Sequence, residues 1–202
     1  TINYKEKGSH LILSKAPPVK TSSTTAIFII SGYIEDKASG ERVADASVYE
    51  KSTLASAVTN EFGYYKIRLD KNEETVSLSV SKRNYRDTLV VVTAPGNQYI
   101  NIAIDPVEGD SMKVTASIKT DSVKQEEKLE FPYESEVNVQ NIHDTLYSEV
   151  QISLLPFVGS NGRLSGNVIN DYSINIFGGY SLGTRKIELG FFFNTDRGDV
   201  SF

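Results

Sequence analysis

The sequence predicts an all-β fold, and three of its features support this prediction. No stretch keeps apolar residues at positions i, i+3, i+4 and i+7 over three turns, as an amphipathic helix would. Short runs of alternating apolar and polar residues recur instead, bounded by Gly, Asn and Asp. Seven of these runs follow one another within one part of the chain, which is typical of a β-sandwich.

The composition is that of an ordinary globular protein and excludes several classes. The 202 residues, 39% of them hydrophobic, suffice for one or two domains with a core. The absence of cysteine excludes disulfides, thiolate metal sites and a cysteine nucleophile. The net charge of -5 argues against a nucleic-acid partner. Because the chain opens at Thr1 without Met and stops at Phe202 after a strand-like run, we expect a fragment.

Residues 1–19 precede the sandwich and read as the end of a short N-terminal domain or a tail. Residues 3–13 predict two short strands around Lys7-Gly8-Ser9, and a Pro- and Ser/Thr-rich linker runs from Ala16 to Thr25. The stretch Asn3–Leu13 resembles the closing hairpin of the short secretin-and-TonB N-terminal domain.

Residues 26–107 predict the seven-stranded β-sandwich. Alternation within the runs gives each strand one buried face, as Val76, Leu78 and Val80 show. The predicted strands are Ile27–Ile34, Ala46–Tyr49, Ala55–Val58, Tyr64–Leu69, Thr75–Ser81, Thr88–Thr93 and Tyr99–Ile104.

Residues 108–149 form a predicted acidic linker. Residues 107 to 149 include ten acidic residues and four lysines, which gives a net charge of -6, while the rest of the chain carries +1. The stretch lacks periodicity, so we expect an extended, solvated connector.

Residues 150–202 differ in sequence pattern from the predicted sandwich and from the predicted linker. The runs Val150–Val158, Asn167–Phe177 and Arg185–Asn194 alternate regularly and are longer than the strands of most soluble sheets. Their length and pattern are those of transmembrane β-strands, so the sequence predicts the first antiparallel strands of an incomplete β-barrel. A soluble sheet with one buried face would show the same alternation.

The runs Ile30 to Val48 and Val58 to Ile67 resemble the carboxypeptidase-regulatory-like domain, a transthyretin-like β-sandwich. In this pattern Gly32 lies where neighbouring backbone approaches closely, and Gly40 and Gly63 serve turns. Domains of this kind accompany peptidases, receptors and adhesins, so the resemblance implies a fold and no chemistry.

The stretch Ile152 to Phe202 is similar to the first strands of outer-membrane surface-repeat barrels of Gram-negative bacteria. Gly178 and Gly179 are expected to form a turn between two strands. The resemblance implies an outer-membrane protein that contacts lipid and faces the periplasm with residues 1–149, where it meets a protein partner. It is carried by Pro156, Asn167, Asn170, Ser173, Asn175, Gly178-Gly179-Tyr180 and Glu188-Leu189-Gly190 with Asn194.

Four short motifs suggest modification. Each places Ser or Thr between Asp and an apolar residue, the pattern of bacterial O-glycosylation. The predicted acceptors are Thr88, Ser111, Ser122 and Thr145.

No catalytic, cofactor-binding or metal-binding residue is predicted. His143-Asp144 has no scaffold to fix a triad geometry. The Asp70–Glu74 run lacks the spacing of a calcium loop.

The leading interpretation is therefore a non-enzymatic N-terminal part of an outer-membrane β-barrel protein, whose sandwich is a structural and protein-interaction module. The first alternative is the N-terminal extension of a TonB-dependent transporter, which predicts a plug domain next. The second is a secreted adhesin or carbohydrate-binding protein with an exposed aromatic platform, for which Tyr64, Tyr65 and Tyr85 are candidates.

Overall fold

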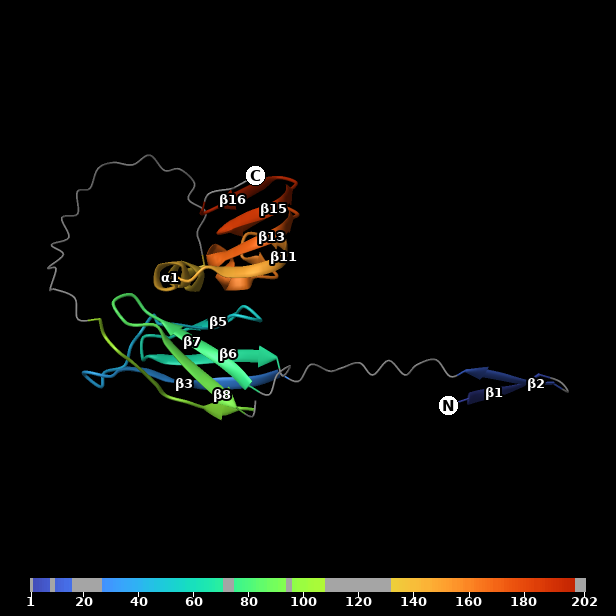
Figure 1. Cartoon of the computed structure of the whole chain (residues 1–202), viewed down its shortest axis with the longest axis horizontal. Helices are drawn as coiled ribbons and strands as arrows, with labels where there is room; N and C mark the ends of the chain where they lie inside the picture. Colours follow the sequence, from blue (N-terminus) through green and yellow to red (C-terminus); the bar gives the residue numbers. More distant parts are fainter. Residues whose placement is uncertain are drawn as a thin grey trace.

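The computed structural model places two strand-rich units one above the other (Figure 1). A β-sandwich spans residues 27–107, and a second unit follows from residue 132. The described residues are 2–7, 10–15, 27–70, 75–93, 96–107 and 132–198, the first two ranges as backbone only. Among these residues no helix is both long and apolar enough to cross a bilayer.

The N-terminal strands β1 (Ile2–Lys7) and β2 (His10–Lys15) pair antiparallel. The register runs from Ile2 opposite Lys15 to Lys7 opposite His10. The two strands predicted around Lys7-Gly8-Ser9 are therefore present.

The first sheet of the sandwich is built around its longest strand, β3 (Ile27–Asp36). β6 (Tyr64–Asp70) pairs antiparallel with β3 on one side. On the other side β9 (Gln98–Tyr99) and β10 (Ile102–Ile104) pair with β3 in parallel. Between them the Asn101 side-chain oxygen accepts the Tyr33 N–H at 3.0 Å, so a side chain replaces one rung of the ladder. The last predicted run is thus divided into β9 and β10.

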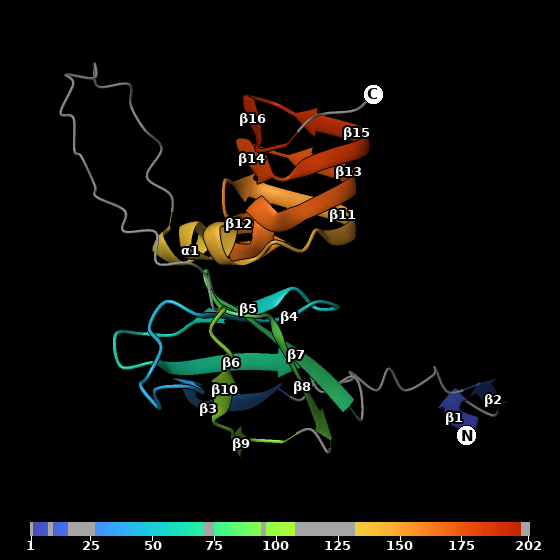
Figure 2. The same cartoon turned by 60° about the vertical axis from the view of Figure 1, so that its left-hand side comes forward.

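The second sheet is antiparallel throughout and lies nearer the C-terminal unit (Figure 2). Its order is β5 (Ala55–Val58), β4 (Ser47–Glu50), β7 (Thr75–Ser81) and β8 (Thr88–Thr93). The alternating residues of both sheets meet in one core, so the predicted β-sandwich is confirmed. Its fully buried members include Ile30, Ile34, Val48, Ile67, Leu78, Val80 and Ile104.

The predicted linker 108–149 is wrong in its last part. Residues 108–131 lie outside the described residues, but helix α1 (Tyr133–Asn141) follows, and β11 begins at Leu146. α1 has no continuous apolar stripe: Asn138 and Asn141 are buried beside Val137. Its packing is therefore partly polar, which is why an apolar periodicity could not reveal it.

The C-terminal strands pair in parallel, contrary to the predicted antiparallel arrangement. β13 (Val168–Asn175) lies between β11 (Leu146–Leu155) and β15 (Gly183–Gly190), parallel to both. β14 (Gly178–Ser181) and β16 (Phe193–Asp196) form a second parallel pair. Among the described strands of this unit, only β12 (Val158–Gly159) runs antiparallel, beside β11. The 3-10 helix η1 (Gly162–Asn167) leads into β13.

The strands run parallel because the segments that connect them are themselves strands and form a second parallel pair. From β13 the chain turns into β14 and returns as β15, so it winds in coils instead of forming hairpins. Tyr172 pairs with Ile187 and Gly178 with Phe193, so the chain returns to the same place after 15 residues in this part of the unit. The first coil is longer: Val150 of β11 pairs with Tyr172 of β13, 22 residues later. Gly178 and Gly179, predicted as a turn, begin β14, and the bend falls at residues 176–177.

Candidate functional site

The sandwich and the C-terminal unit meet at an apolar junction. Tyr49 of β4 is buried against Ile142, between α1 and β11, and against Val168 of β13. Burial raises the pKa of the Tyr49 hydroxyl. Leu146 and Leu164 complete this cluster, with Leu54 packed at its edge. A residue of the sandwich thus closes the first coil, whose apolar end would otherwise lie in water.

Asn141 links the two units by hydrogen bonds from the end of α1. Its amide nitrogen donates to the Asp45 carbonyl oxygen at 2.6 Å and to Ser47 Oγ at 3.2 Å. Its side-chain oxygen accepts the Arg83 N–H at 3.2 Å. Because Asn141 is buried, losing these bonds would leave polar groups without partners inside the protein.

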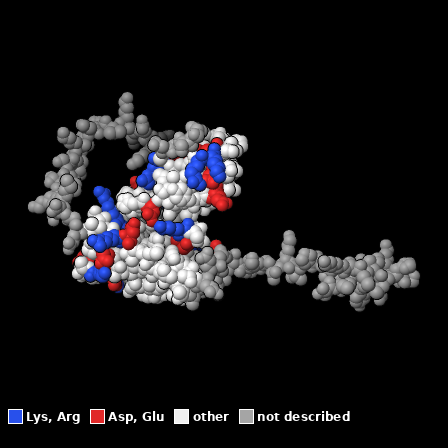
Figure 3. Space-filling view, viewed as in Figure 1, with Lys and Arg blue, Asp and Glu red and all other residues white. Residues whose placement is uncertain are grey.

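Two further contacts lie at the rim of the junction. Lys51 and Asp144 form an ion pair at 2.7 Å, and the hydrogen bond from Lys51 raises the pKa of its ammonium group. The Tyr133 hydroxyl donates to Asp45 Oδ1 at 2.6 Å. Lys, Arg, Asp and Glu gather along this boundary in Figure 3.

Glu50 shapes the turn that carries Lys51 and Leu54 to the junction. Its carboxylate accepts hydrogen bonds from the N–H and hydroxyl groups of Ser52 and Thr53, at 2.6 to 2.9 Å. Burial alone would raise the pKa of Glu50, but these bonds outweigh it and lower the pKa below its usual value.

The interior of the coils is polar. Asn161 donates to Gln151 Oε1 at 3.0 Å and to Asn170 Oδ1 at 2.8 Å, while Asn170 donates to Gln151 Oε1 at 2.7 Å. These three amides form a closed network that binds β11 to β13. Such a network fixes which residues face each other because every mismatch leaves buried amides unpaired.

A second interior network extends to the last described coil. Asn175 donates to Glu188 Oε1 at 3.1 Å and to Asn194 Oδ1 at 2.9 Å. Ser153 Oγ lies 2.5 Å from Asn175 Oδ1 on the other side. Burial and the neighbouring Asp196 carboxylate raise the pKa of Glu188 to about 7.

The outer wall of the coils is apolar. Two rows of side chains cross β11, β13 and β15: Val150, Tyr172 and Ile187 in one row, Ile152, Ile174 and Leu189 in the other. We call these six residues the apolar wall. Their exposed fractions lie between 39% and 56%, while interior residues such as Ser173 are buried. This distribution is the reverse of that in an ordinary soluble sheet.

Different groups border the two ends of the apolar wall. At one end Asp171 binds both Arg185 and Lys186, whose hydrogen bonds lower the pKa of the Asp171 carboxyl. At the other end the rings of Phe177 and Phe192 stack at 5.7 Å. The wall therefore has a charged border, made of one carboxylate and two cations, and an aromatic border.

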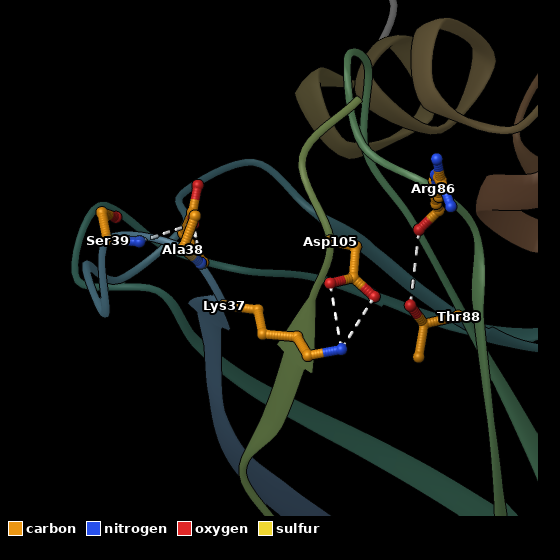
Figure 4. A network of polar contacts seen from close by, with 7 residues as sticks. Lys37, Ala38, Ser39, Arg86, Thr88 and Asp105 are labelled. Carbon is orange, nitrogen blue, oxygen red and sulfur yellow. Dashed lines mark hydrogen bonds and ion pairs between the residues drawn. The ribbon is translucent and has the colours of Figure 1, made fainter. Parts of the chain in front are cut away.

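The predicted O-glycosylation acceptors are scattered. Thr88 begins β8, and its hydroxyl donates to the Arg86 carbonyl oxygen at 3.3 Å, near the Lys37–Asp105 ion pair (Figure 4). Thr145 is exposed just before β11. Ser111 and Ser122 lie outside the described residues. The structure therefore does not bring the two described acceptors into one site.

Among the predicted structural glycines, Gly32 has the strictest surroundings. A Cβ at this position would lie 1.9 Å from the Ile100 carbonyl oxygen. Gly40 and Gly63 have φ angles of +75° and +72°, which glycine adopts without strain.

The three tyrosines considered as a carbohydrate platform do not share one exposed surface. Tyr65 is buried in the core and donates to the Ile100 carbonyl oxygen at 2.8 Å; burial raises its pKa to about 12. Tyr85 is half-buried and donates to Asp36 Oδ2. Only Tyr64 remains on an outer face, where Tyr33 lies 5.5 Å away. No group of three metal-ligating side chains occurs among the described residues.

The CarboxypepD_reg-like domain family matches residues 30–130 of this chain. No curated protein matches it.

Three solved structures are similar to part of this chain. Two are chains from type II cohesin–X-dockerin complexes of Acetivibrio cellulolyticus, a C-terminal and an N-terminal interface mutant. They are 23% and 24% identical, with TM-scores of 0.31 and 0.33, and each match covers 38% of this chain and 56% of the other. The third is the phospholipase PlaB from Legionella pneumophila in complex with thio-NAD, at 11% identity and a TM-score of 0.32, covering 56% of this chain and 33% of the enzyme. The chain thus spans little more than half the length of the first two.

Proposed function

This chain belongs to the CarboxypepD_reg-like domain family, and from this premise we propose that it is a non-catalytic part of an outer-membrane protein. In this proposal the sandwich is a structural and protein-interaction module on the periplasmic side. It caps the coils, and the apolar wall lies against membrane lipid.

The observation that carries the lipid contact is the reversed distribution of side chains. Water favours a wall with its polar residues outside, and an apolar surrounding favours the opposite. Here Ile152, Ile174 and Leu189 point outward while Ser153, Ser173 and Asn175 are buried. The aromatic border supports the same placement because aromatic rings concentrate at membrane–water interfaces.

The junction supports the structural role of the sandwich. Parallel coils need a cap at the end of their apolar cluster, and Tyr49 supplies one. In the described residues the coils begin directly after α1, and no further globular domain lies between α1 and β11. This order favours the proposal over a transporter extension, which would continue into a plug domain.

The test is flotation of the full chain with vesicles of phosphatidylethanolamine and phosphatidylglycerol. We expect the chain to float, and Ile174→Glu in the apolar wall to lower the floated fraction about tenfold, since a charge in lipid is costly. Leu89→Glu is the matched control because Leu89 is an exposed apolar residue of the sandwich. Circular dichroism of both variants establishes that they fold.

The border charges make a second readout available. Because Asp171 offsets one of the two positive charges of Arg185 and Lys186 and the contact is carried by apolar side chains, flotation should persist in about 0.5 M salt, where exposed charges are screened. A chain that stays with the soluble fraction, or an Ile174→Glu variant that floats like the wild type, would contradict lipid contact. In intact cells, the sandwich should resist protease added from outside.

A further inference from the structure

A cluster of aromatic residues lies on the outer face of the first sheet. The ring of Tyr33 in β3 meets Tyr64 of β6 at 5.5 Å and 65°, and Tyr99 of β9 at 6.3 Å and 73°. The Arg42 guanidinium lies 3.3 Å from the Tyr33 ring centroid. Tyr99 is 61% exposed. These near-perpendicular rings form a notch and not a flat platform.

A line of cations continues from the notch along β6. Lys66 and Arg68 follow Tyr64 at alternate positions, and both are exposed. We call Tyr33, Tyr64, Tyr99, Arg42, Lys66 and Arg68 the basic aromatic face. In Figure 2 strands β3 and β9 lie on the side of the sandwich away from the C-terminal unit. The junction therefore leaves this face open.

The cations of the basic aromatic face are available for a partner. Across the described parts of the chain, the five ion pairs use other lysines and arginines, so Arg42, Lys66 and Arg68 have no carboxylate partner there. The acidic residues of the same sheet face, Glu35 and Asp70, lie toward its two ends. A positive strip thus stands out on a chain whose net charge is -5.

We propose that the basic aromatic face binds an acidic segment of a partner protein in extended conformation, with carboxylates at alternate residues. Alternate residues of a strand lie about 6.6 Å apart, and an extended peptide repeats at the same distance. Carboxylates at every second residue would therefore match Lys66 and Arg68 in turn. The notch would hold an aromatic or apolar side chain at the end of the segment, as Tyr and Arg do at binding hot spots.

The topology favours a peptide over other anionic chains. Within the described residues β6 is an edge strand, paired only with β3. An extended peptide can add to such an edge through its backbone as well as bind through its side chains. The inference rests on the proposed role of the sandwich as a protein-interaction module, and it is independent of lipid contact.

The experiment measures binding of a fluorescent peptide to the full chain by anisotropy. The probe has eight residues, with Glu alternating with Thr and a terminal Tyr; a second peptide has the same composition with its Glu residues in one block. We expect the alternating probe to bind more tightly, and Lys66→Glu or Arg68→Glu to weaken it about tenfold at low salt. Tyr99→Ala should weaken it by a smaller factor. Arg86→Glu is the matched control because it makes the same change of charge at an exposed site outside the face.

Each result decides the proposal. Loss of binding in Lys66→Glu and Arg68→Glu, with Arg86→Glu unchanged, supports it. Equal binding of the two peptides, no binding of either, or tighter binding of an oligogalacturonate than of the alternating probe would overturn it. Vesicle flotation of the same variants separates the two proposals: Lys66→Glu should float like the wild type, so a failure of peptide binding leaves lipid contact standing.

Discussion

Asn175 donates its side-chain amide to Asn194 Oδ1 at 2.9 Å, across two successive coils. Each asparagine side chain also lies over a glycine of its own coil. A Cβ on Gly179 would come within 2.1 Å of Asn175 Nδ2, and one on Gly190 within 2.3 Å of Asn194 Oδ1. The spacing of Gly and Asn in Gly190–Asn194 therefore has a physical meaning: the glycine leaves room for the asparagine that joins the coils.

Asn175→Ala should destabilise the C-terminal coils by about 1–3 kcal/mol, because it removes the hydrogen bonds that this buried side chain makes with Ser153, Glu188 and Asn194. Urea unfolding followed by circular dichroism measures the change. Thr195→Ala, at an exposed position of β16, should stay within about 0.5 kcal/mol of the wild type. Equal stability of the two variants would show that the network does not hold the coils together.

Gly32→Ala should destabilise the sandwich by about 3 kcal/mol, since the added methyl group would overlap the Ile100 carbonyl oxygen. Ser31→Ala is the control because it changes the neighbouring residue on the outer side of the same strand. Thermal unfolding compares the two. A Gly32→Ala variant with an unchanged melting temperature would mean that β3 and Ile100 are not in close contact.

The two polar links of the junction should differ in strength. Asn141→Ala should lower the free energy of unfolding by about 1–3 kcal/mol, because the groups that Asn141 binds, such as the Asp45 carbonyl oxygen, would lose their hydrogen-bond partner at a buried site. Lys51→Ala should cost less than about 1 kcal/mol, since the Lys51–Asp144 pair is half-exposed and screened by water. Differential scanning calorimetry of the full chain measures the two losses of stability. A larger loss of stability for Lys51→Ala than for Asn141→Ala would contradict this account of the junction.

The last described coil should lose stability as the pH rises. The pKa of Glu188 in the folded chain, about 7, lies above its ordinary value of 4.5, so folding favours the protonated carboxyl. This stabilisation is complete below pH 4.5 and is lost as the pH rises through about 7. Amide hydrogen exchange in β15, corrected for intrinsic rates, should show weaker protection at high than at low pH. Glu188→Gln should remove most of this difference.

Part of this fold could be predicted from the sequence. Alternation and turn residues located the strands of the sandwich because one face of each strand is buried in a single core. The close backbone at Gly32 was expected from a glycine inside a strand. The tyrosine at position 65 was not recognised as a core residue, because a hydroxyl that is hydrogen-bonded in the interior looks the same in sequence as one in water.

The direction of pairing in the C-terminal unit could not be predicted. Outward Ile174 and inward Ser173 and Asn175 alternate in the same way whether the neighbouring strand runs parallel or antiparallel. What distinguishes them is the connection: four residues of β14 extend the wall between β13 and β15. The sequence interpretation took the glycines of that connection for a hairpin turn, and the error in direction followed from it.

The 15-residue spacing from β13 to β15 and from β14 to β16 also limits how this unit can change during evolution. Duplicating one such coil would lengthen the wall by one strand spacing, ~4.8 Å, and leave the inward and the outward side chains on their own sides. Adding a single residue within β13 would send the later side chains of that strand to the opposite side, placing amides in the outer wall and isoleucines in the interior. Tolerated length changes should therefore occur as complete coils, so that the unit grows in steps and not residue by residue.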